Sequence, residues 1–129
     1  MIDYVFRGQK EDGSFAVGSL IYFGWDPFIY QSYGDENFCE DNLCAVDEET
    51  VSPWTMVWAK DNKRLFVGDK VELNYGYSKQ RYTGEVQMHN GSYYIKVNVV
   101  GKCYDYCEFL ELDKCSNITI IGNIYERGK

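Results

Sequence analysis

Three observations predict an all-β fold, mainly antiparallel. Segments such as "SFAVGSLIYF" (14–23) and "YYIKVNVV" (93–100) are rich in β-branched and aromatic residues in near alternation, as in strands with one face in a core. Asn-Gly and Asp-Gly pairs separate several such segments and favour tight turns. Helical periodicity of apolar residues is poor throughout the chain. Together these patterns predict sheets joined by short turns.

Eight strands are expected, at 2–7, 14–23, 28–33, 70–76, 81–89, 93–100, 104–110 and 117–125. Asn90-Gly91 predicts a hairpin with a type I′ turn, because both residues readily adopt positive φ. Asp12-Gly13 predicts a second hairpin turn. The stretch "DEET" (47–50) is expected to form one short helical turn. Residues 34–66 otherwise follow neither the strand pattern nor the helix pattern.

The length of 129 residues predicts one domain that spans the whole chain. The C-terminal half, 60–129, carries "VGDKVELN", "TGEVQM" and "ITIIGNIYE", a run of strands similar to a small SH3-like barrel. Gly68-Asp69 would be the turn before the first of these strands. The acidic N-terminal region, 1–59, is expected to add a β-hairpin or sheet extension to that barrel.

Negative charge is concentrated in the first half of the chain. The net charge is −7, but residues 11–59 contain ten acidic residues and no Lys or Arg. Residues 1–10 carry +1, and residues 60–129 carry eleven basic and nine acidic residues, or +2. A surface with this charge repels nucleic-acid phosphates and anionic lipid and speeds encounter with basic proteins.

The densest acidic stretch is "YGDENFCEDNLCAVDEET" (33–50), which holds seven of these carboxylates. Carboxylates that steer a partner, beside aromatic rings that anchor it, are typical of a protein-binding surface. A solvated face that only keeps the chain in solution is the alternative. The predicted partner-binding residues are Asp35, Glu36, Phe38, Glu40, Asp41, Asp47, Glu48 and Glu49.

Five segments of the sequence resemble the YopX family of phage and prophage proteins. They are "FRGQKEDGSFAVGSL" (6–20), "VDEETV" (46–51), "KDNKRLFVGDKVELN" (60–74), "YTGEVQMHNGSYYIKV" (82–97) and "ITIIGNIYERGK" (118–129). The resemblance implies a phage or mobile-element origin and no particular reaction, because the family has no assigned activity. "SPWTMVWA" (52–59) departs from the pattern of the family, and so does the loop that holds Cys39 and Cys44.

The five cysteines suggest reduced thiols in a reducing cytosol, and Cys39, Cys44, Cys103 and Cys107 are weak candidates for metal ligands. If 103–107 is a strand, its terminal Cα atoms are about 13 Å apart, too far for two sulfurs on one zinc ion. We therefore expect neither a metal nor a cofactor.

No enzymatic activity and no catalytic residue are predicted. The single histidine, His89, adjoins the Asn90-Gly91 turn, where an exposed position is expected. The sequence has no Gly-rich phosphate loop, no H-E-x-x-H and no G-x-S-x-G motif. Paired carboxylates as in glycosidases stay an open alternative, because acidic residues are plentiful.

A secondary surface is predicted in "NYGYSKQRY" (74–82), where tyrosines alternate with basic residues. Such a patch suits nucleic-acid stacking or a protein interface, but a pI of about 4.6 disfavours direct nucleic-acid binding. Packing of the tyrosines on their own sheet is the structural alternative. The residues of this surface are Tyr75, Tyr77, Lys79, Arg81 and Tyr82.

These patterns favour a non-enzymatic phage accessory protein that binds a host or phage protein with a basic surface. A specific form of this hypothesis is an acidic inhibitor of a host nucleic-acid-binding or defence protein, comparable to anti-CRISPR proteins that mimic nucleic acid. The alternatives are a homo-oligomeric structural or assembly module and a small β-barrel that binds nucleic acid. With no signal sequence and no long apolar segment, a cytoplasmic location in the bacterial host is expected, away from membranes.

Overall fold

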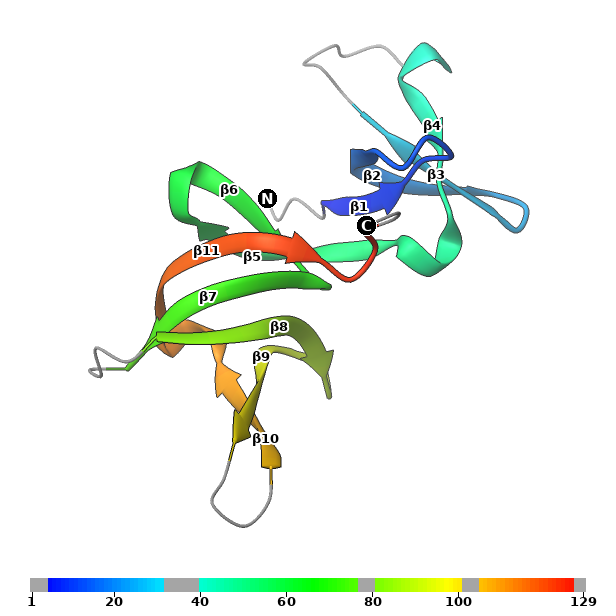
Figure 1. Cartoon of the computed structure of the whole chain (residues 1–129). Coiled ribbons are helices and arrows are strands. Elements are labelled where there is room, and N and C mark those ends of the chain that lie inside the picture. Colours follow the sequence, from blue (N-terminus) through cyan, green and yellow to red (C-terminus); the bar gives the residue numbers. More distant parts are fainter. Residues whose placement is uncertain (1–4, 32–39, 77–80, 101–104, 127–129) are drawn as a thin grey trace. The chain divides into compact units, whose positions relative to one another are not determined.

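The chain folds into β-strands linked by tight turns, as the sequence predicts (Figure 1). The structure is a computed structural model, and it describes residues 5–31, 40–76, 81–100 and 105–126. Within those ranges there is no α-helix. The strands are β1 (Phe6–Gln9), β2 (Phe15–Phe23), β3 (Asp26–Tyr30), β4 (Leu43–Ala45), β5 (Ser52–Ala59), β6 (Lys63–Phe66), β7 (Asp69–Tyr75), β8 (Arg81–His89), β9 (Ser92–Val100), β10 (Asp105–Glu111) and β11 (Cys115–Asn123).

These strands form two antiparallel sheets. One has six strands in the order β4-β3-β2-β1-β5-β6, and the other has five in the order β10-β9-β8-β7-β11. Four short 3₁₀ turns accompany them: η1 (Glu40–Asn42), η2 (Glu48–Thr50), η3 (Lys60–Asn62) and η4 (Leu112–Lys114). The chain divides into two compact units, residues 1–54 with 125–129 and residues 55–124. Strand β5 begins in the first unit and continues in the second.

The first unit is built around β2, which pairs with two strands in succession. Its residues Phe15–Gly18 pair with β1, and Ser19–Phe23 pair with β3. Gly18 lies where the pairing changes, and a Cβ there would overlap the carbonyl oxygen of Tyr30. The interior contains polar as well as apolar side chains, since Gln9, Thr50 and Ser52 are buried along with Ile29. Specific hydrogen bonds must therefore stabilise this unit.

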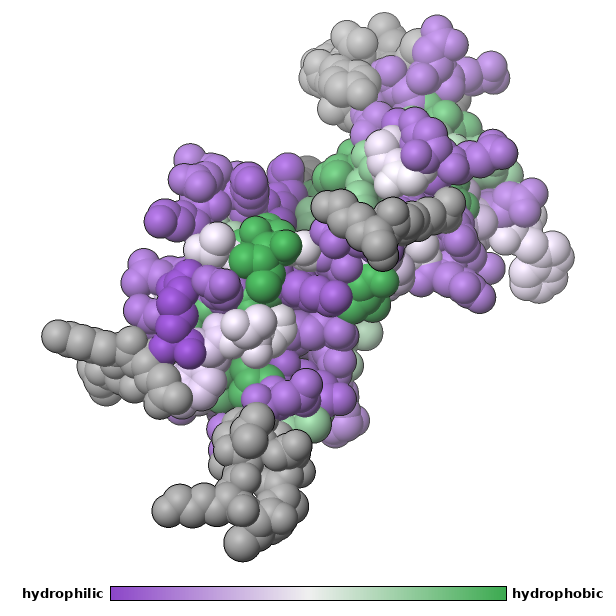
Figure 2. All heavy atoms as spheres, in the orientation of Figure 1, coloured by the Kyte–Doolittle hydropathy of each residue, from purple (hydrophilic) through white to green (hydrophobic). Residues whose placement is uncertain are grey.

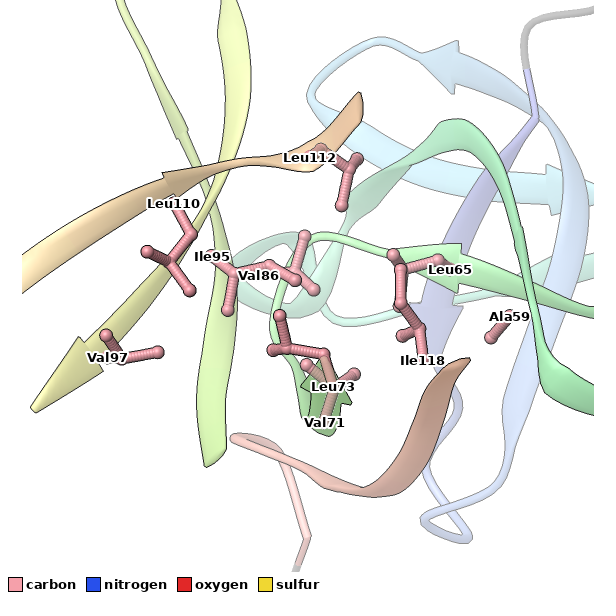
Figure 3. Packing of buried hydrophobic residues seen from close by; sticks show 10 residues of the cluster. All are labelled: Ala59, Leu65, Val71, Leu73, Val86, Ile95, Val97, Leu110, Leu112 and Ile118. Carbon is pink, nitrogen blue, oxygen red and sulfur yellow. The ribbon is translucent and has the colours of Figure 1, made fainter. Parts of the chain in front are cut away.

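The second unit contains the hydrophobic core (Figure 3). The side chains in the figure point toward one another from the five-stranded sheet and from β5, β6 and η4. Alternate residues of the strands supply them, as a sheet with one buried face requires. The buried residues of this cluster are Ala59, Leu65, Val71, Leu73, Val86, Ile95, Val97, Leu110, Leu112 and Ile118.

Both predicted hairpin turns are confirmed. Asn90 and Gly91 have φ values of 51° and 79°, and His89 pairs with Ser92 across them, as in a type I′ turn. In the other turn, Gly13 has φ of 91° and donates its N–H to the Lys10 carbonyl at 3.0 Å. The short helical turn expected at 47–50 is the 3₁₀ turn η2.

Two expectations about the sheets need correction. No strand was expected at 43–45, 52–59 or 63–66, where β4, β5 and β6 lie. A small SH3-like barrel was expected in the C-terminal half, but no closed barrel forms among the described strands, because β10 and β11 occupy opposite edges of the five-stranded sheet. That sheet is therefore open. The prediction of a single domain stays a prediction.

Candidate functional site

Three consecutive acidic residues of the first unit, Asp47, Glu48 and Glu49, form a well-defined turn that we call the acidic turn. The Asp47 side chain accepts the N–H of Glu49 at 3.1 Å and so caps η2. The Asp47 carbonyl accepts the Thr50 hydroxyl at 2.6 Å, and that hydroxyl accepts the buried N–H of Gln9 at 2.8 Å. The Asp47 N–H in turn donates to the Gln9 carbonyl at 2.9 Å. These bonds fix the backbone of the acidic turn against β1.

The carboxylates of the acidic turn are exposed, and within the described ranges no ion pair involves any of them. One cation lies nearby, because Lys10, Glu11 and Asp47 line the same shallow hollow of about 340 Å³. Lys10 and Glu11 lie in the connection between β1 and β2, which also contains Asp12. The pKa of Asp12 is lowered because the Ser14 hydroxyl and N–H donate to its carboxylate at 2.6 and 2.9 Å. The carboxylates therefore present their charge to solvent.

The same unit contains a hairpin with an aromatic tip, and this hairpin is hydrogen-bonded to the residue that precedes the acidic turn. Strands β2 and β3 are joined by Gly24, with φ of 64°, and Trp25. The tip projects from the body of this unit (Figure 1), and 93% of Trp25 is exposed. Behind it, the ring of Phe23 packs edge-to-face on Phe28 at 5.4 Å. The residue before the acidic turn, Val46, donates its N–H to Pro27 in this hairpin at 3.3 Å.

The predicted acidic residues do not form one continuous patch among the residues that the structure describes. Glu40 and Asp41 are exposed in η1, before β4, whereas the acidic turn follows β4. Leu43 of β4 pairs with Tyr30, and Ala45 pairs with Phe28. Strand β4 thus separates the two acidic groups, in sequence and along the sheet (Figure 1). Three predicted partner-binding residues lie outside the described ranges: Asp35, Glu36 and Phe38.

The secondary surface contains residues that support its own unit. Tyr75 and Tyr82 are partly buried and pack against the hydrophobic core. Arg81 crosses the sheet, with Nε 3.4 Å from Glu72 Oε2 and one terminal nitrogen 3.2 Å from Thr119 Oγ1. These contacts agree with the structural alternative for this patch. Tyr77 and Lys79 lie outside the described ranges.

No group of three or more His, Cys, Asp or Glu residues suited to a metal ion occurs in the described part of the chain. Three of the five cysteines are described, and they are free thiols at Cys44, Cys107 and Cys115. Cys44 lies in the first unit, whereas Cys107 and Cys115 lie in the second. Cys39 and Cys103, the other two weak candidates, lie outside the described ranges.

Burial raises the pKa of the Cys115 thiol to about 11, with a further contribution from the charge of Asp113. Only about one thiol in a thousand is then ionised at pH 8, and the thiolate is the reactive form. We expect Cys115 to be alkylated by iodoacetamide far more slowly than the exposed Cys107, with a rate that keeps rising up to about pH 11. Peptide mapping after timed alkylation measures both rates, and equal rates at pH 8 would contradict the assignment.

The single histidine is exposed at the end of β8 and stacks on Phe109, with ring centroids 6.0 Å apart. Within the described ranges, the side chain of His89 has no hydrogen bond to a cysteine or serine that it could activate. None of the described helices is long or apolar enough to cross a membrane.

Comparisons with protein-family models, with curated proteins and with solved structures give no match to this chain. The resemblance to the YopX family stays a prediction. Sequence reasoning singled out the acidic segment and considered Phe38, Tyr33 and Trp25 as exposed aromatic residues beside it, but it did not place Trp25 at the tip of a hairpin. The signal was present, because Gly24-Trp25 separates two segments of strand-like composition.

Proposed function

We propose that this protein is a non-enzymatic binding protein that uses its first unit to engage a partner protein with a basic surface. The observation that supports this most directly is the combination of the acidic turn with the exposed tip at Trp25. The backbone of the acidic turn is fixed by hydrogen bonds, so the backbone of this segment loses little conformational freedom on binding. Trp25 offers a large apolar surface that a partner could enclose.

The two features have different physical roles. The carboxylates attract a cationic partner over long range and set its orientation, mainly through the association rate. A tryptophan that becomes buried in a pocket contributes most to the lifetime of the complex, because aromatic side chains dominate interface hot spots. Figure 2 shows hydrophilic residues over much of the visible surface of the first unit, so an apolar anchor must be local.

The proposed partner is a host protein with a basic groove, such as a nucleic-acid-binding or defence protein. The support is the charge of the first unit, where residues 1–54 and 125–129 carry four basic and twelve acidic residues, or −8. An exposed array of carboxylates of this kind can occupy a groove that normally holds phosphates. The resemblance to phage proteins adds a biological setting in which stoichiometric inhibitors are useful.

We also propose an SH3-like arrangement for the second unit. Its support is the order of the five strands, in which the last strand, β11, lies beside the first, β7, and the others follow in sequence. The 3₁₀ turn η4 immediately before β11 agrees with it. Gly84 supports a sharply bent sheet, because its Cα approaches β9 so closely that a Cβ would lie 2.7 Å from the Lys96 carbonyl oxygen.

Reversing two charges of the acidic turn, with Glu48→Lys and Glu49→Lys, is expected to weaken partner capture at least tenfold and to make the remaining capture less sensitive to salt. The measurement is affinity capture from bacterial lysate at several salt concentrations, read by mass spectrometry. Asp47 is left intact because it caps η2.

The matched control reverses two exposed acids of the second unit, with Glu108→Lys and Asp113→Lys. It changes the net charge equally, so it should leave the captured partner unchanged. Trp25→Ala should lower capture at all salt concentrations. If the two double variants capture the same proteins in the same amounts, the acidic turn only keeps the chain in solution.

A homo-oligomeric assembly module is the second candidate. Strands β10 and β11 are the edges of the five-stranded sheet, and a strand edge is a ready template for pairing with another copy. Light scattering of the purified full chain separates the candidates, because a monomer at high concentration is incompatible with an assembly module.

A further inference from the structure

We infer that the outer face of strands β7 to β10 in the second unit binds single-stranded nucleic acid. This inference does not depend on the proposed function of the first unit. It rests on a row of side chains that crosses four strands, on a stacked aromatic platform at one end of that row, and on a polar groove at the other.

The row is defined by strand register. Phe109 of β10 pairs with Lys96 of β9, Lys96 pairs with Glu85 of β8, and Glu85 pairs with Lys70 of β7. Directly opposed residues of antiparallel strands lie on the same face of a sheet. The neighbouring row of Leu110, Ile95 and Val86 is buried in the core. The row from Phe109 to Lys70 therefore faces away from the core.

The aromatic end of this face is a small platform. Phe109 is 51% exposed, and its ring stacks on His89, with centroids 6.0 Å apart and planes inclined by 23°. Tyr94 meets Phe109 edge-to-face at 6.4 Å. The neighbouring rings restrict Phe109 while it stays half exposed. A restrained, exposed ring on a sheet is the element on which a nucleobase stacks.

The basic part of the face is a groove of about 280 Å³ lined by polar side chains. Lys70, Glu85 and Lys96 line it, and the side chains of the two lysines have no hydrogen bond or ion pair with another described residue. Asn98 also lines the groove, and its Oδ1 accepts the Cys107 thiol at 3.2 Å, so its amide N–H groups remain available as donors. Two ammonium groups and an amide suit a phosphate group.

Three acidic residues with described side chains share this face, and each already has a partner. Glu72 of β7 lies 3.4 Å from Arg81 Nε. The carboxylate of Glu85 accepts the Gln87 amide at 2.8 Å, and Glu111 forms an ion pair with Lys114 at 3.1 Å. None of these contacts involves Lys70 or Lys96. With Arg81 and Lys114 counted, the four basic residues of this face are balanced by Glu72, Glu85, Glu111 and Asp105 at the start of β10. Attraction of a phosphate must therefore be local to Lys70 and Lys96.

The charge of the whole chain does not exclude this ligand. Residues 55–124 contain nine basic and eight acidic residues, a net charge of +1, whereas the remainder of the chain carries −8. Repulsion of phosphates is thus concentrated in the first unit. The Debye length is about 8 Å at physiological salt, so a carboxylate farther than this from the face is largely screened from it.

The test is fluorescence anisotropy of a fluorescein-labelled oligothymidylate of about twelve nucleotides, titrated with the full chain. We expect binding that Phe109→Ala weakens about tenfold and that Phe109→Tyr retains. Lys96→Ala should weaken binding and reduce the slope of log affinity against log salt by about 0.7. Lys63→Ala removes one positive charge from the exposed first position of β6. This control should change neither the affinity for the oligonucleotide nor its salt dependence.

Any of three results would overturn the inference. One is no saturable binding at low salt. Another is that the Phe109→Ala variant binds with the same affinity as the unaltered chain, when both have the same melting temperature. The ring of Phe109 would then not stack on a base. If Lys63→Ala reduces binding as much as Lys96→Ala, the attraction is diffuse and the face is not a site.

Discussion

Replacing Gly18 with alanine is expected to destabilise the first unit by about 3 kcal/mol or more. A Cβ at this position would overlap the carbonyl oxygen of Tyr30 and would lie 2.9 Å from the carbonyl carbon. Both atoms belong to the backbone of β3, so no side-chain rotation relieves the overlap. Strands β2 and β3 would have to separate where Ser19 pairs with Tyr30. Folded domains are stable by only about 5–15 kcal/mol, so this loss is large.

Hydrogen exchange measured by mass spectrometry reports this change unit by unit. We expect protection to fall in peptides of β1 to β3 and to persist in β7 to β9. Gly13→Ala is the matched control, because its added Cβ meets no atom within 4 Å and only the positive φ of 91° is unfavourable. That control should cost about 1 kcal/mol. If Gly18→Ala is no less stable than Gly13→Ala, β2 and β3 do not approach each other closely enough at Gly18 to exclude a Cβ.

The fold class could be predicted because its signals are local. Strands β2, β8 and β9 have nine residues each, so their composition and alternation extend over enough positions to be recognised. The turn at Asn90-Gly91 depends on the conformational preferences of two residues. Neither signal needs knowledge of which strands become neighbours.

The strands between residues 43 and 66 depend on contacts that are distant in sequence. Strand β4 has three residues and exists through its pairing with β3. Strand β5 pairs with β1 at Ser52 and Pro53, and Met56 within it has φ of 68°, which interrupts the extended backbone. A short strand and an irregular strand carry little periodicity, so sequence patterns could not reveal them.

The candidate site was predictable in composition and less so in arrangement. The sequence shows the acidic residues as one run, whereas the fold places β4 between Glu40-Asp41 and the acidic turn. The net charge of the whole chain also hides the difference in charge between the two units. The face near Phe109, with its lysines and aromatic rings, was therefore missed. Its members are far apart in sequence, and only register brings Phe109, Lys96 and Lys70 into one row.

Asp69→Ala is expected to destabilise the second unit by about 2–3 kcal/mol. Asp69 is 1% exposed, and its Oδ2 accepts the N–H of Phe66 at 2.9 Å across the turn at Gly68. Gly68 itself joins this turn to the middle of β8 and to the residue after β11, because its N–H donates to the Val86 carbonyl and its carbonyl accepts the N–H of Ile124, both at 2.9 Å. Losing the carboxylate removes a charge-assisted acceptor from a buried N–H.

Urea unfolding followed by hydrogen exchange of the β6 and β7 peptides measures this loss. Asp69→Asn keeps an acceptor oxygen of the same size and should retain part of the stability that alanine loses. Asp113→Ala removes an exposed carboxylate from the same unit and should change stability by less than about 0.5 kcal/mol. If Asp69→Ala and Asp113→Ala have equal effects, the turn is held by its backbone alone. The Gly-Asp pair would then matter only for the positive φ of 96° at Gly68.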